Sequence, residues 1–192
     1  MHAAVFLDRD GTINEEMGYI NHPDRFILLP GVAAAIKRIN HSGLKVVVVT
    51  NQAGAARGYF PVEMIDRVHQ KMQVLLEREG AFLDGIYTCS HAPEGEGETG
   101  EPCSCRKPQI GLLQQAAAEL HIDLQKSYVV GDRFKDMEMA HNAGCKGVLV
   151  LTGYGKGELE FLAHVSRVKP THVAADLPAA VDWIIQDAER PI

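Results

Sequence analysis

Long hydrophobic runs and an excess of positive charge are both missing from this chain. No apolar stretch reaches the roughly 18 residues that a membrane-spanning helix requires, so we expect no membrane partner. A formal net charge of −6 lacks the basic footprint of a protein that coats nucleic acid, so we expect no nucleic-acid partner. The N-terminus also lacks the basic and then apolar layout of a signal peptide, which predicts a cytoplasmic protein.

Cysteine is scarce, with four residues in a chain of 192. Because cytoplasmic thiols stay reduced, we interpret them as metal ligands or packed side chains before disulfides. Apolar residues make up 46% of the chain and charged residues 23%, which is typical of an ordinary globular protein. The length fits a single domain, 1–192, and we expect a monomer.

Short valine-rich stretches alternate with segments of helical periodicity. This alternation predicts a mainly parallel sheet covered on both faces, in a Rossmann-like three-layer α/β domain. The interval between Asp10 and the first expected helix is too short for a separate cap domain, so the pocket should be shallow. The expected strands are 3–7, 44–50, 84–89, 127–132, 147–152 and 171–176, and the expected helices are 31–43, 62–80, 110–122, 135–144 and 177–189.

Polar side chains follow the ends of several expected strands. Asp8 and Asp10 close the first strand, and Thr50 closes the second. Asp132 closes "YVVG", and Lys107 follows the irregular segment after the third strand. Ligands bind outside the carboxyl ends of the strands in an open parallel sheet, so we expect these side chains to meet on one rim.

Two acids one residue apart in an extended chain point the same way and repel each other. That repulsion between Asp8 and Asp10, with Asp132 added, is relieved if Mg²⁺ lies among them. Asp8 would then attack phosphorus as a nucleophile, and Asp10 would act as general acid and base. Whether Asp10 binds metal through its carboxylate or its backbone carbonyl is left open. Thr50 and Lys107 would stabilise the transferring phosphoryl oxygens.

The ordered set D-R-D-G-T, V-V-T-N, R-K-P and V-V-G-D-R-x-x-D, within positions 5–136, resembles the haloacid dehalogenase superfamily of phosphohydrolases. An isolated D-x-D-G is more simply a polar turn, but the full set in this order is far more specific. The resemblance implies the same catalytic roles and makes Asp132 the third metal-binding carboxylate. Asp136 becomes a supporting carboxylate, either beside the metal ligands or at a helix cap.

The segment 90–108 is rich in Gly, Glu and Pro and lacks periodicity, so the loop 89–105 requires a special explanation. Its ends supply Cys89-x-His91 and Cys103-x-Cys105, the four ligands that a closed tetrahedral zinc site needs. A Cys103–Cys105 disulfide would form a strained ring, and a redox pair would have C-x-x-C spacing. We therefore expect a structural zinc ion that clamps this loop and positions the cations after it.

Three further segments are given structural interpretations. Cys145 precedes an apolar run and is expected to be packed. The acidic run 94–101 is expected to be a solvated loop tip. The stretch "TGYGKGE" at 152–158 lacks the spacing of a phosphate-binding loop and is interpreted as a turn after a strand.

Within the superfamily, the zinc-binding loop resembles two families, the D-glycero-D-manno-heptose-1,7-bisphosphate 7-phosphatases and the histidinol-phosphate phosphatases. The stretches "VVVTNQAGAARGYF" and "EMGY" look more like the heptose enzymes. This resemblance implies that a small sugar bisphosphate is the substrate and loses its C7 phosphate, in the supply of nucleotide-activated heptose. Histidinol-phosphate phosphatase activity and a non-catalytic phosphate-binding zinc module are the alternatives. The matching substrate-binding positions are Glu16, Met17, Gly18, Tyr19, Asn51, Gln52, Ala53, Arg106 and Arg133.

Two arginines near one rim suit a doubly phosphorylated substrate, because guanidinium binds phosphate bidentately. Arg133 stands where the family has a lysine, and pairing with nearby Asp136 is its alternative role. The zinc loop also has extra Gly and Glu residues compared with the family. Neither departure touches the expected chemistry, but both bear on the choice of substrate.

Overall fold

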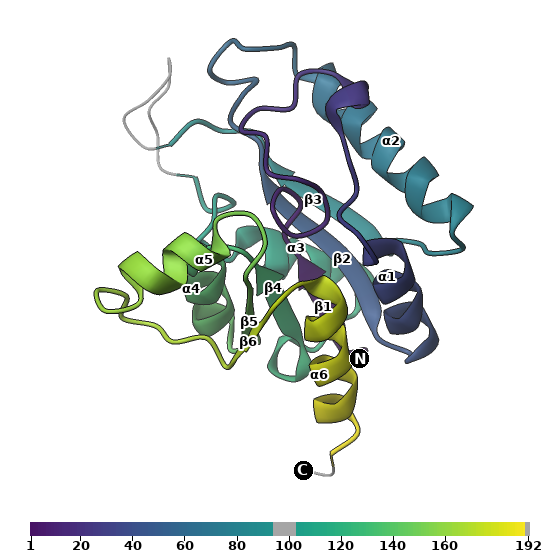
Figure 1. The fold of residues 1–192 in the computed structure, drawn as a ribbon, viewed down its shortest axis with the longest axis vertical. Coiled ribbons are helices and arrows are strands. Elements are labelled where there is room, and N and C mark those ends of the chain that lie inside the picture. The colour runs from purple at the N-terminus through teal and green to yellow at the C-terminus, as the bar shows by residue number, and fades with distance from the viewer. Residues whose placement is uncertain (94–102, 191–192) are drawn as a thin grey trace.

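Six parallel strands form one sheet in the computed structural model of the protein, in the order β3-β2-β1-β4-β5-β6 (Figure 1). The structure describes residues 1–93 and 103–190, so the expected loop tip at 94–101 lies outside the described residues. The strands are β1 (Ala4–Leu7), β2 (Lys45–Asn51), β3 (Gly85–Cys89), β4 (Tyr128–Gly131), β5 (Lys146–Val150) and β6 (His172–Ala174).

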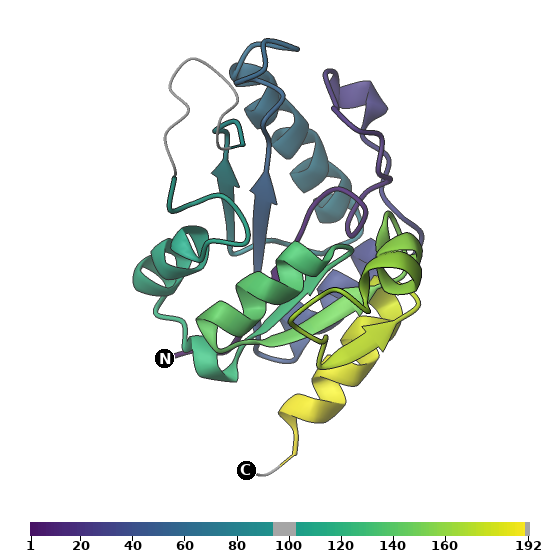
Figure 2. The same ribbon diagram turned by 90° about the vertical axis from the view of Figure 1, so that its left-hand side faces the viewer.

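Helices cover both faces of the sheet and connect its strands (Figure 2). One face packs against α1, α2 and α6, and the other packs against α3 and α4. The long helices are α1 (Val32–His41), α2 (Glu63–Arg78), α3 (Gly111–Leu120), α4 (Phe134–Ala143) and α6 (Leu177–Ala188). The short helical segments are η1 (Pro23–Arg25), η2 (Leu124–Lys126), α5 (Gly155–Gly157) and η3 (Glu158–Leu162).

The central strand β1 shows why the strand sequences are apolar without alternation. Val5 and Leu7 face the layer of α1 and α6, and Ala4 and Phe6 face the layer of α3 and α4. All four side chains are fully buried, because helices exclude water from both faces. The expected three-layer α/β architecture is therefore confirmed.

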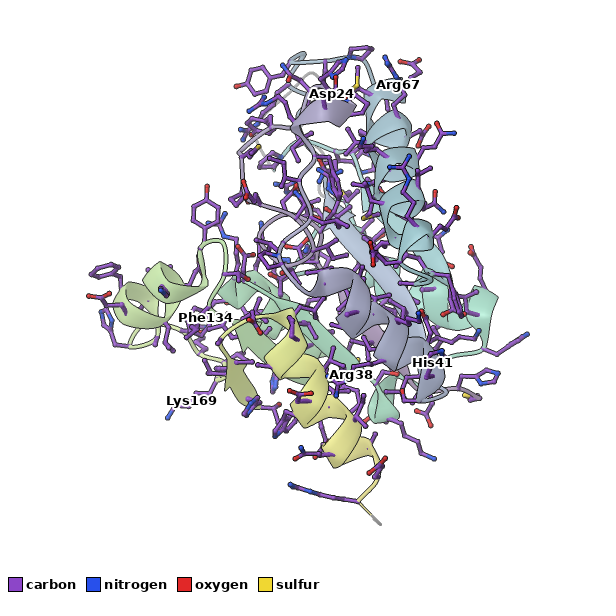
Figure 3. All side chains as sticks on the ribbon, turned by 45° about the vertical axis from the view of Figure 1, so that its right-hand side comes forward. Asp24, Arg38, His41, Arg67, Phe134 and Lys169 are labelled. Atoms are coloured by element: carbon purple, nitrogen blue, oxygen red, sulfur yellow. The ribbon has the colours of Figure 1, made fainter. Side chains whose placement is uncertain are left out.

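The helices α1 and α6 lie side by side on one face and are joined at their surface by an ion pair. Arg38 Nη1 on α1 lies 2.6 Å from Asp182 Oδ1 on α6. Figure 3 shows Arg38 and His41 pointing outward from α1.

At its start, α6 is capped by the Asp176 carboxylate, which accepts a hydrogen bond from the Ala179 N–H at 2.9 Å. Sequence signals of this kind explain why the expected helix boundaries agree with the structure.

One segment differs from its expected conformation. The stretch 152–158 begins as the expected turn at 152–154 but becomes helical at Gly155 and continues into the π-helix η3. Glycine has a low intrinsic helix propensity, but tertiary packing can override this propensity, and here the segment packs tightly. A Cβ atom on Gly155 would lie 1.8 Å from the Val150 carbonyl oxygen, so only glycine fits this close approach.

The parallel topology places the carboxyl ends of β1, β2 and β4 next to one another at one edge of the sheet. That edge is where the polar residues of the sequence motifs gather. Among the helices of residues 1–93 and 103–190, none is long and apolar enough to cross a membrane.

Truncation of Ile184 tests the packing of α6. This side chain is fully buried between α6 and the sheet, so Ile184→Ala should lower the free energy of unfolding by about 2–5 kcal/mol. The matched control is Val165→Ala, because Val165 is 65% exposed and should change stability by no more than about 0.5 kcal/mol. Urea denaturation measures both, and equal losses would contradict this description of the core.

Candidate active site

A buried ammonium joins two carboxylates at the centre of the site. Lys107 Nζ lies 2.7 Å from Asp8 Oδ1 and 2.7 Å from Asp136 Oδ1. Asp8 directly follows β1, and Asp136 lies in the first turn of α4. Burial alone would lower the pKa of Lys107, but the charges of Asp136 and Asp8 outweigh it and raise that pKa. Lys107 therefore remains charged and holds Asp8 in one orientation.

Asp132, directly after β4, projects into the same edge. Its Oδ2 accepts a hydrogen bond from the Tyr154 N–H at 2.8 Å, while its buried Oδ1 has no hydrogen-bond partner among the residues described. Two glycines make room for it, because a Cβ atom on either Gly11 or Gly153 would lie 2.1 Å from Asp132 Oδ2. Both glycines have positive φ values, which other residues rarely adopt.

The carboxylates fit a divalent cation. One oxygen from each of Asp8, Asp132 and Asp136 lies within 4.8 Å of the others. Burial, and next the charge of Asp8, raise the pKa of Asp132 to about 8. Burial likewise raises the pKa of Asp8, despite its contact with Lys107. A hard cation is the group that would relieve this repulsion and satisfy Asp132 Oδ1, and oxygen ligands of this kind suit Mg²⁺.

The Asp10 carboxylate is turned away from that cluster. It accepts hydrogen bonds from Arg9 Nη2 at 2.9 Å, Asn14 Nδ2 at 2.9 Å and Gln52 Nε2 at 2.7 Å. Burial alone would raise the pKa of Asp10, but the Arg9 charge and these hydrogen bonds outweigh it and lower that pKa. The sequence leaves open whether Asp10 would bind metal through its carboxylate or its backbone carbonyl. Because the carboxylate is occupied by these hydrogen bonds, the backbone carbonyl is the better candidate.

Arg9 owes its position to α2. Its side chain is 1% exposed, and its Nη1 lies 3.3 Å from Nε2 of His69. Burial, and next the Arg9 charge, lower the pKa of His69 to about 4, so the ring is neutral near pH 7 and accepts the hydrogen bond. Sequence reasoning missed this pair, since Arg9 lies inside the motif without a chemical role and His69 has no ligand spacing.

Two residues at the end of β2 are fixed by hydrogen bonds. Thr50 Oγ1 accepts from Gln52 Nε2 at 2.9 Å, so its own hydroxyl proton is directed elsewhere. Asn51 forms a reciprocal pair with the backbone of Lys107, accepting from its N–H at 3.1 Å and donating to its carbonyl at 3.4 Å. Asn51 thus anchors the segment that supplies Lys107, besides lining the pocket.

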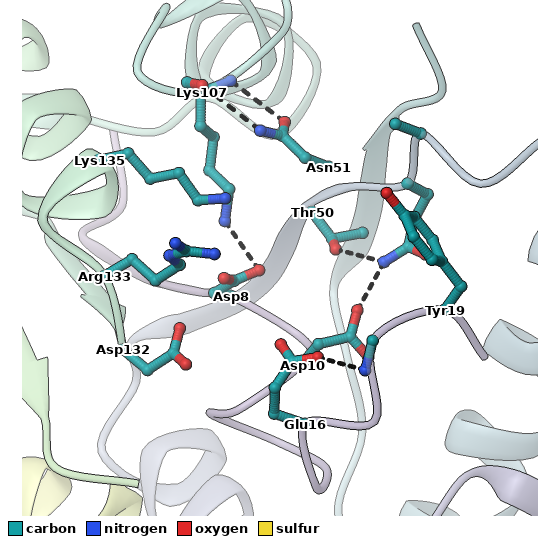
Figure 4. Close-up of a pocket in the computed structure, with 13 residues that line it drawn as sticks. Asp8, Asp10, Glu16, Tyr19, Thr50, Asn51, Lys107, Asp132, Arg133 and Lys135 are labelled. Carbon is teal, nitrogen blue, oxygen red and sulfur yellow. Dashed lines mark hydrogen bonds and ion pairs between the residues drawn. The ribbon is translucent and has the colours of Figure 1, made fainter. Parts of the chain in front are cut away.

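A pocket opens over these groups (Figure 4). Most of the residues expected to bind substrate line it, but Met17 packs against the core and Arg106 donates to the His91 carbonyl at 3.1 Å. The pocket is lined by Asp8, Asp10, Glu16, Gly18, Tyr19, Thr50, Asn51, Gln52, Ala53, Lys107, Asp132, Arg133 and Lys135.

Arg133 lines the pocket and is held by two neighbours. Its Nε donates to Glu158 Oε1 at 3.3 Å, and its guanidinium stacks 4.4 Å from the centre of the Tyr154 ring. Its side chain does not pair with Asp136, although its backbone N–H donates to Asp136 Oδ2 at 3.2 Å. No pattern in the sequence indicated Glu158, which lies in the helical segment after β5 and contacts the site from there.

The four expected zinc ligands meet at the end of β3. Cys89 Sγ lies 3.6 Å from Cys103 Sγ, Cys103 Sγ lies 3.6 Å from Cys105 Sγ, and His91 Nδ1 lies 3.2 Å from Cys105 Sγ. Metal–ligand bonds of about 2.0–2.3 Å place tetrahedral ligands about 3.5–3.8 Å apart, so the four residues are compatible with a zinc ion. The fourth cysteine, Cys145, packs in the core as expected.

Removal of the buried ammonium should destabilise the protein, because the carboxylates around it would lose their counter-charge. Lys107→Met should lower the free energy of unfolding by about 3–5 kcal/mol, because it leaves two buried carboxylates unpaired. Adding Asp136→Asn should restore part of this loss. In contrast, Lys146→Met, at a half-exposed ion pair with Asp187, should cost about 1 kcal/mol or less. Urea denaturation of the three variants and the wild type measures these differences, and equal losses would refute the role of Lys107.

Comparisons with known proteins agree with this geometry. A family model described as HAD-hydrolase-like matches residues 104–180. The chain is 42% identical over 187 residues to the D-glycero-D-manno-heptose-1,7-bisphosphate 7-phosphatase of Thermosynechococcus vestitus, covering 94% of both chains. It is 45% identical over 153 residues to the corresponding D-glycero-beta-D-manno-heptose enzyme of Escherichia coli K12, covering 78% of this chain and 80% of that one.

A solved structure is similar over nearly the whole chain. It is the D,D-heptose 1,7-bisphosphate phosphatase from B. bronchiseptica, complexed with magnesium and phosphate. The two superpose with a TM-score of 0.85 at 34% identity, covering 96% of this chain and 99% of that one. The chain therefore belongs to the heptose-1,7-bisphosphate 7-phosphatase family of HAD-like hydrolases.

Proposed function

We propose that this protein removes the C7 phosphate of D-glycero-D-manno-heptose 1,7-bisphosphate, in the supply of nucleotide-activated heptose. The proposal is supported above all by the convergence of Asp8, Asp132 and Lys107 in one pocket, in a chain 42% identical to a named relative. HAD phosphatases depend on magnesium, and the B. bronchiseptica structure contains it together with phosphate.

In this proposal, the carboxylates of Asp8 and Asp132 and the Asp10 carbonyl would hold a magnesium ion, which would supply charge neutralisation for the phosphoryl oxygens. The donor set fits, because Asp132 Oδ1 is buried and has no other partner in the described part of the chain. Asp136 acts beside this set as the partner of Lys107 and as a helix cap.

Asp8 is the proposed nucleophile. Its Oδ1 is fixed by the Lys107 ammonium at 2.7 Å and by the Arg9 N–H at 2.7 Å, so the carboxylate presents one orientation to the substrate. Attack on phosphorus forms an aspartyl-phosphate on Asp8 and releases the sugar C7 oxygen. The Thr50 hydroxyl, whose lone pair is occupied by Gln52, is positioned to donate to a phosphoryl oxygen.

Asp10 is the proposed general acid and base. Its lowered pKa keeps it anionic, which suits a base that deprotonates the water attacking the aspartyl-phosphate. The first step requires a proton on Asp10 for the leaving oxygen. The negative charge of a bound phosphate beside Asp10 raises its pKa and favours uptake of that proton.

Substitution of the nucleophile tests the chemical proposal. Asp8→Asn should reduce phosphate release by at least about 10³-fold, because an amide cannot form the acyl-phosphate. The control is Asp182→Asn on the outer surface of α6, which should retain wild-type turnover. Phosphate release with and without Mg²⁺ measures the effect, and wild-type turnover by Asp8→Asn would exclude this mechanism.

A substrate panel tests the choice of substrate. We expect the heptose 1,7-bisphosphate to give a higher kcat/KM than histidinol phosphate or fructose 1,6-bisphosphate. Both anomers of the heptose bisphosphate belong in the panel, because neither sequence nor fold specifies the anomer. Faster turnover of histidinol phosphate would favour the alternative activity, and absence of turnover with every compound would favour a non-catalytic phosphate-binding module.

We also propose that the Cys89–His91–Cys103–Cys105 cluster binds a structural zinc ion. Four protein ligands leave no open coordination position, so this zinc has no catalytic part. Its effect on the site is positional, because Cys105 lies two residues before Lys107. The Cys-rich cluster suits a reducing compartment, so we place the enzyme in the cytoplasm. The monomeric state, the single domain and the absence of nucleic-acid or membrane partners stay predictions.

Metal analysis tests the zinc proposal. The purified protein should contain one zinc ion per chain, and Cys103→Ser should lose it together with part of its kcat. Cys145→Ser is the matched control and should keep the zinc, because Cys145 is not part of the group formed by the four expected ligands. A Cys103→Ser variant that loses zinc but keeps wild-type kcat and KM would contradict the positioning role.

A further inference from the structure

The ammonium of Lys107 lies against three oxygen atoms of the protein. It is 2.7 Å from Asp8 Oδ1, 2.7 Å from Asp136 Oδ1 and 3.3 Å from the Val49 carbonyl oxygen. The side chain is 1% exposed, and it lines the pocket. Because two carboxylates balance the charge of Lys107, a second cation in the pocket would strengthen the binding of a phosphoryl group.

Lys135 is a second lysine at the same place. It is the second residue of α4, it lines the pocket, and Figure 4 shows it extending toward Lys107 and Asp8. Across residues 1–93 and 103–190, its ammonium makes no hydrogen bond or ion pair. The side chain is half-buried, so its unpaired ammonium has lost part of its hydration, which is unfavourable in free energy. An anionic ligand would compensate for this loss.

The other groups at the start of α4 are already engaged. The Phe134 N–H donates to Glu158 Oε2 at 2.7 Å, and the Arg133 N–H donates to Asp136 Oδ2. The Arg133 Nε donates to Glu158, and its guanidinium stacks on the Tyr154 ring. The ammonium of Lys135 has no such partner among the described residues, so its donors are available to a ligand in the pocket.

We propose that Lys135 binds the phosphoryl group transferred to Asp8, donating to its non-bridging oxygens beside Lys107. The sequence motif points to Lys107 for this contact, and the structure adds Lys135 to it. The proposal rests on the proposed function only in that the pocket must accept a phosphate. Arg133 also lines the pocket and remains available for a second phosphate on the substrate.

The test compares three variants of the full chain in the presence of Mg²⁺. Lys135→Gln removes the charge, Lys135→Arg keeps it, and Lys169→Gln removes an exposed lysine far from the pocket (Figure 3). The readouts are the inhibition constant for inorganic phosphate and kcat/KM for p-nitrophenyl phosphate and for the heptose bisphosphate. Binding of inorganic phosphate is also measured by calorimetry, which does not require turnover.

Loss of one charge-assisted hydrogen bond should weaken phosphate binding and kcat/KM in Lys135→Gln by about 10- to 100-fold. Lys135→Arg should recover most of this loss, and Lys169→Gln should match the wild type. The loss should be the same for the monophosphate and the bisphosphate substrate, because both present a transferring phosphoryl group.

Two results would overturn the inference. Unchanged phosphate binding in Lys135→Gln would show that Lys135 does not contact the ligand. A loss confined to the bisphosphate substrate would assign Lys135 to the second phosphate instead. If the wild type hydrolyses no heptose bisphosphate, the proposed function fails, but the calorimetric comparison still decides the role of Lys135.

Discussion

The contact of one buried ammonium with two carboxylates organises this site. Lys107 holds Asp8 and Asp136 together although β1 and α4 lie far apart in the sequence, and in an apolar interior neither acid is stable without it. The backbone on which this ammonium depends is itself held by Asn51 and by the proposed zinc-bound turn. Three parts of the chain thus determine where one nitrogen atom lies, and that nitrogen determines the orientation of the nucleophile.

The two motif acids have different surroundings, and this difference separates their chemistry. Asp8 lies among other carboxylates and a single ammonium, and burial raises its pKa. Asp10 is surrounded by donors from Arg9, Asn14 and Gln52, and its pKa is lowered. Asp8 therefore faces the cation site, and Asp10 faces a shell of hydrogen-bond donors. Surroundings that shift the pKa values of two carboxyl groups in opposite directions suit them to different catalytic roles.

Much of this was predictable from sequence. The strands, the long helices, the rim formed by Asp8, Thr50 and Asp132, and the Cys/His cluster follow from patterns that short-range chemistry imposes. The failures arise from side-chain direction, which tertiary packing decides. Arg106 turns toward the His91 carbonyl, and the Glu158 partner of Arg133 lies in a helical turn that the glycines at 153–157 did not indicate. The partnership of Arg9 with a helix sixty residues away had no local signal at all.

Gly11 and Gly153 have a consequence for how this enzyme can change. Each closes on Asp132 so tightly that no side chain fits, and each belongs to a different loop. The side of the pocket next to Asp132 thus tolerates no substitution at these glycines, whereas the wall that Tyr19 lines is open to substitution, since Tyr19 is 37% exposed. Directed evolution toward new sugar phosphates would have to substitute residues in that wall. Such substitutions would change which sugar is accepted and leave the type of reaction unchanged.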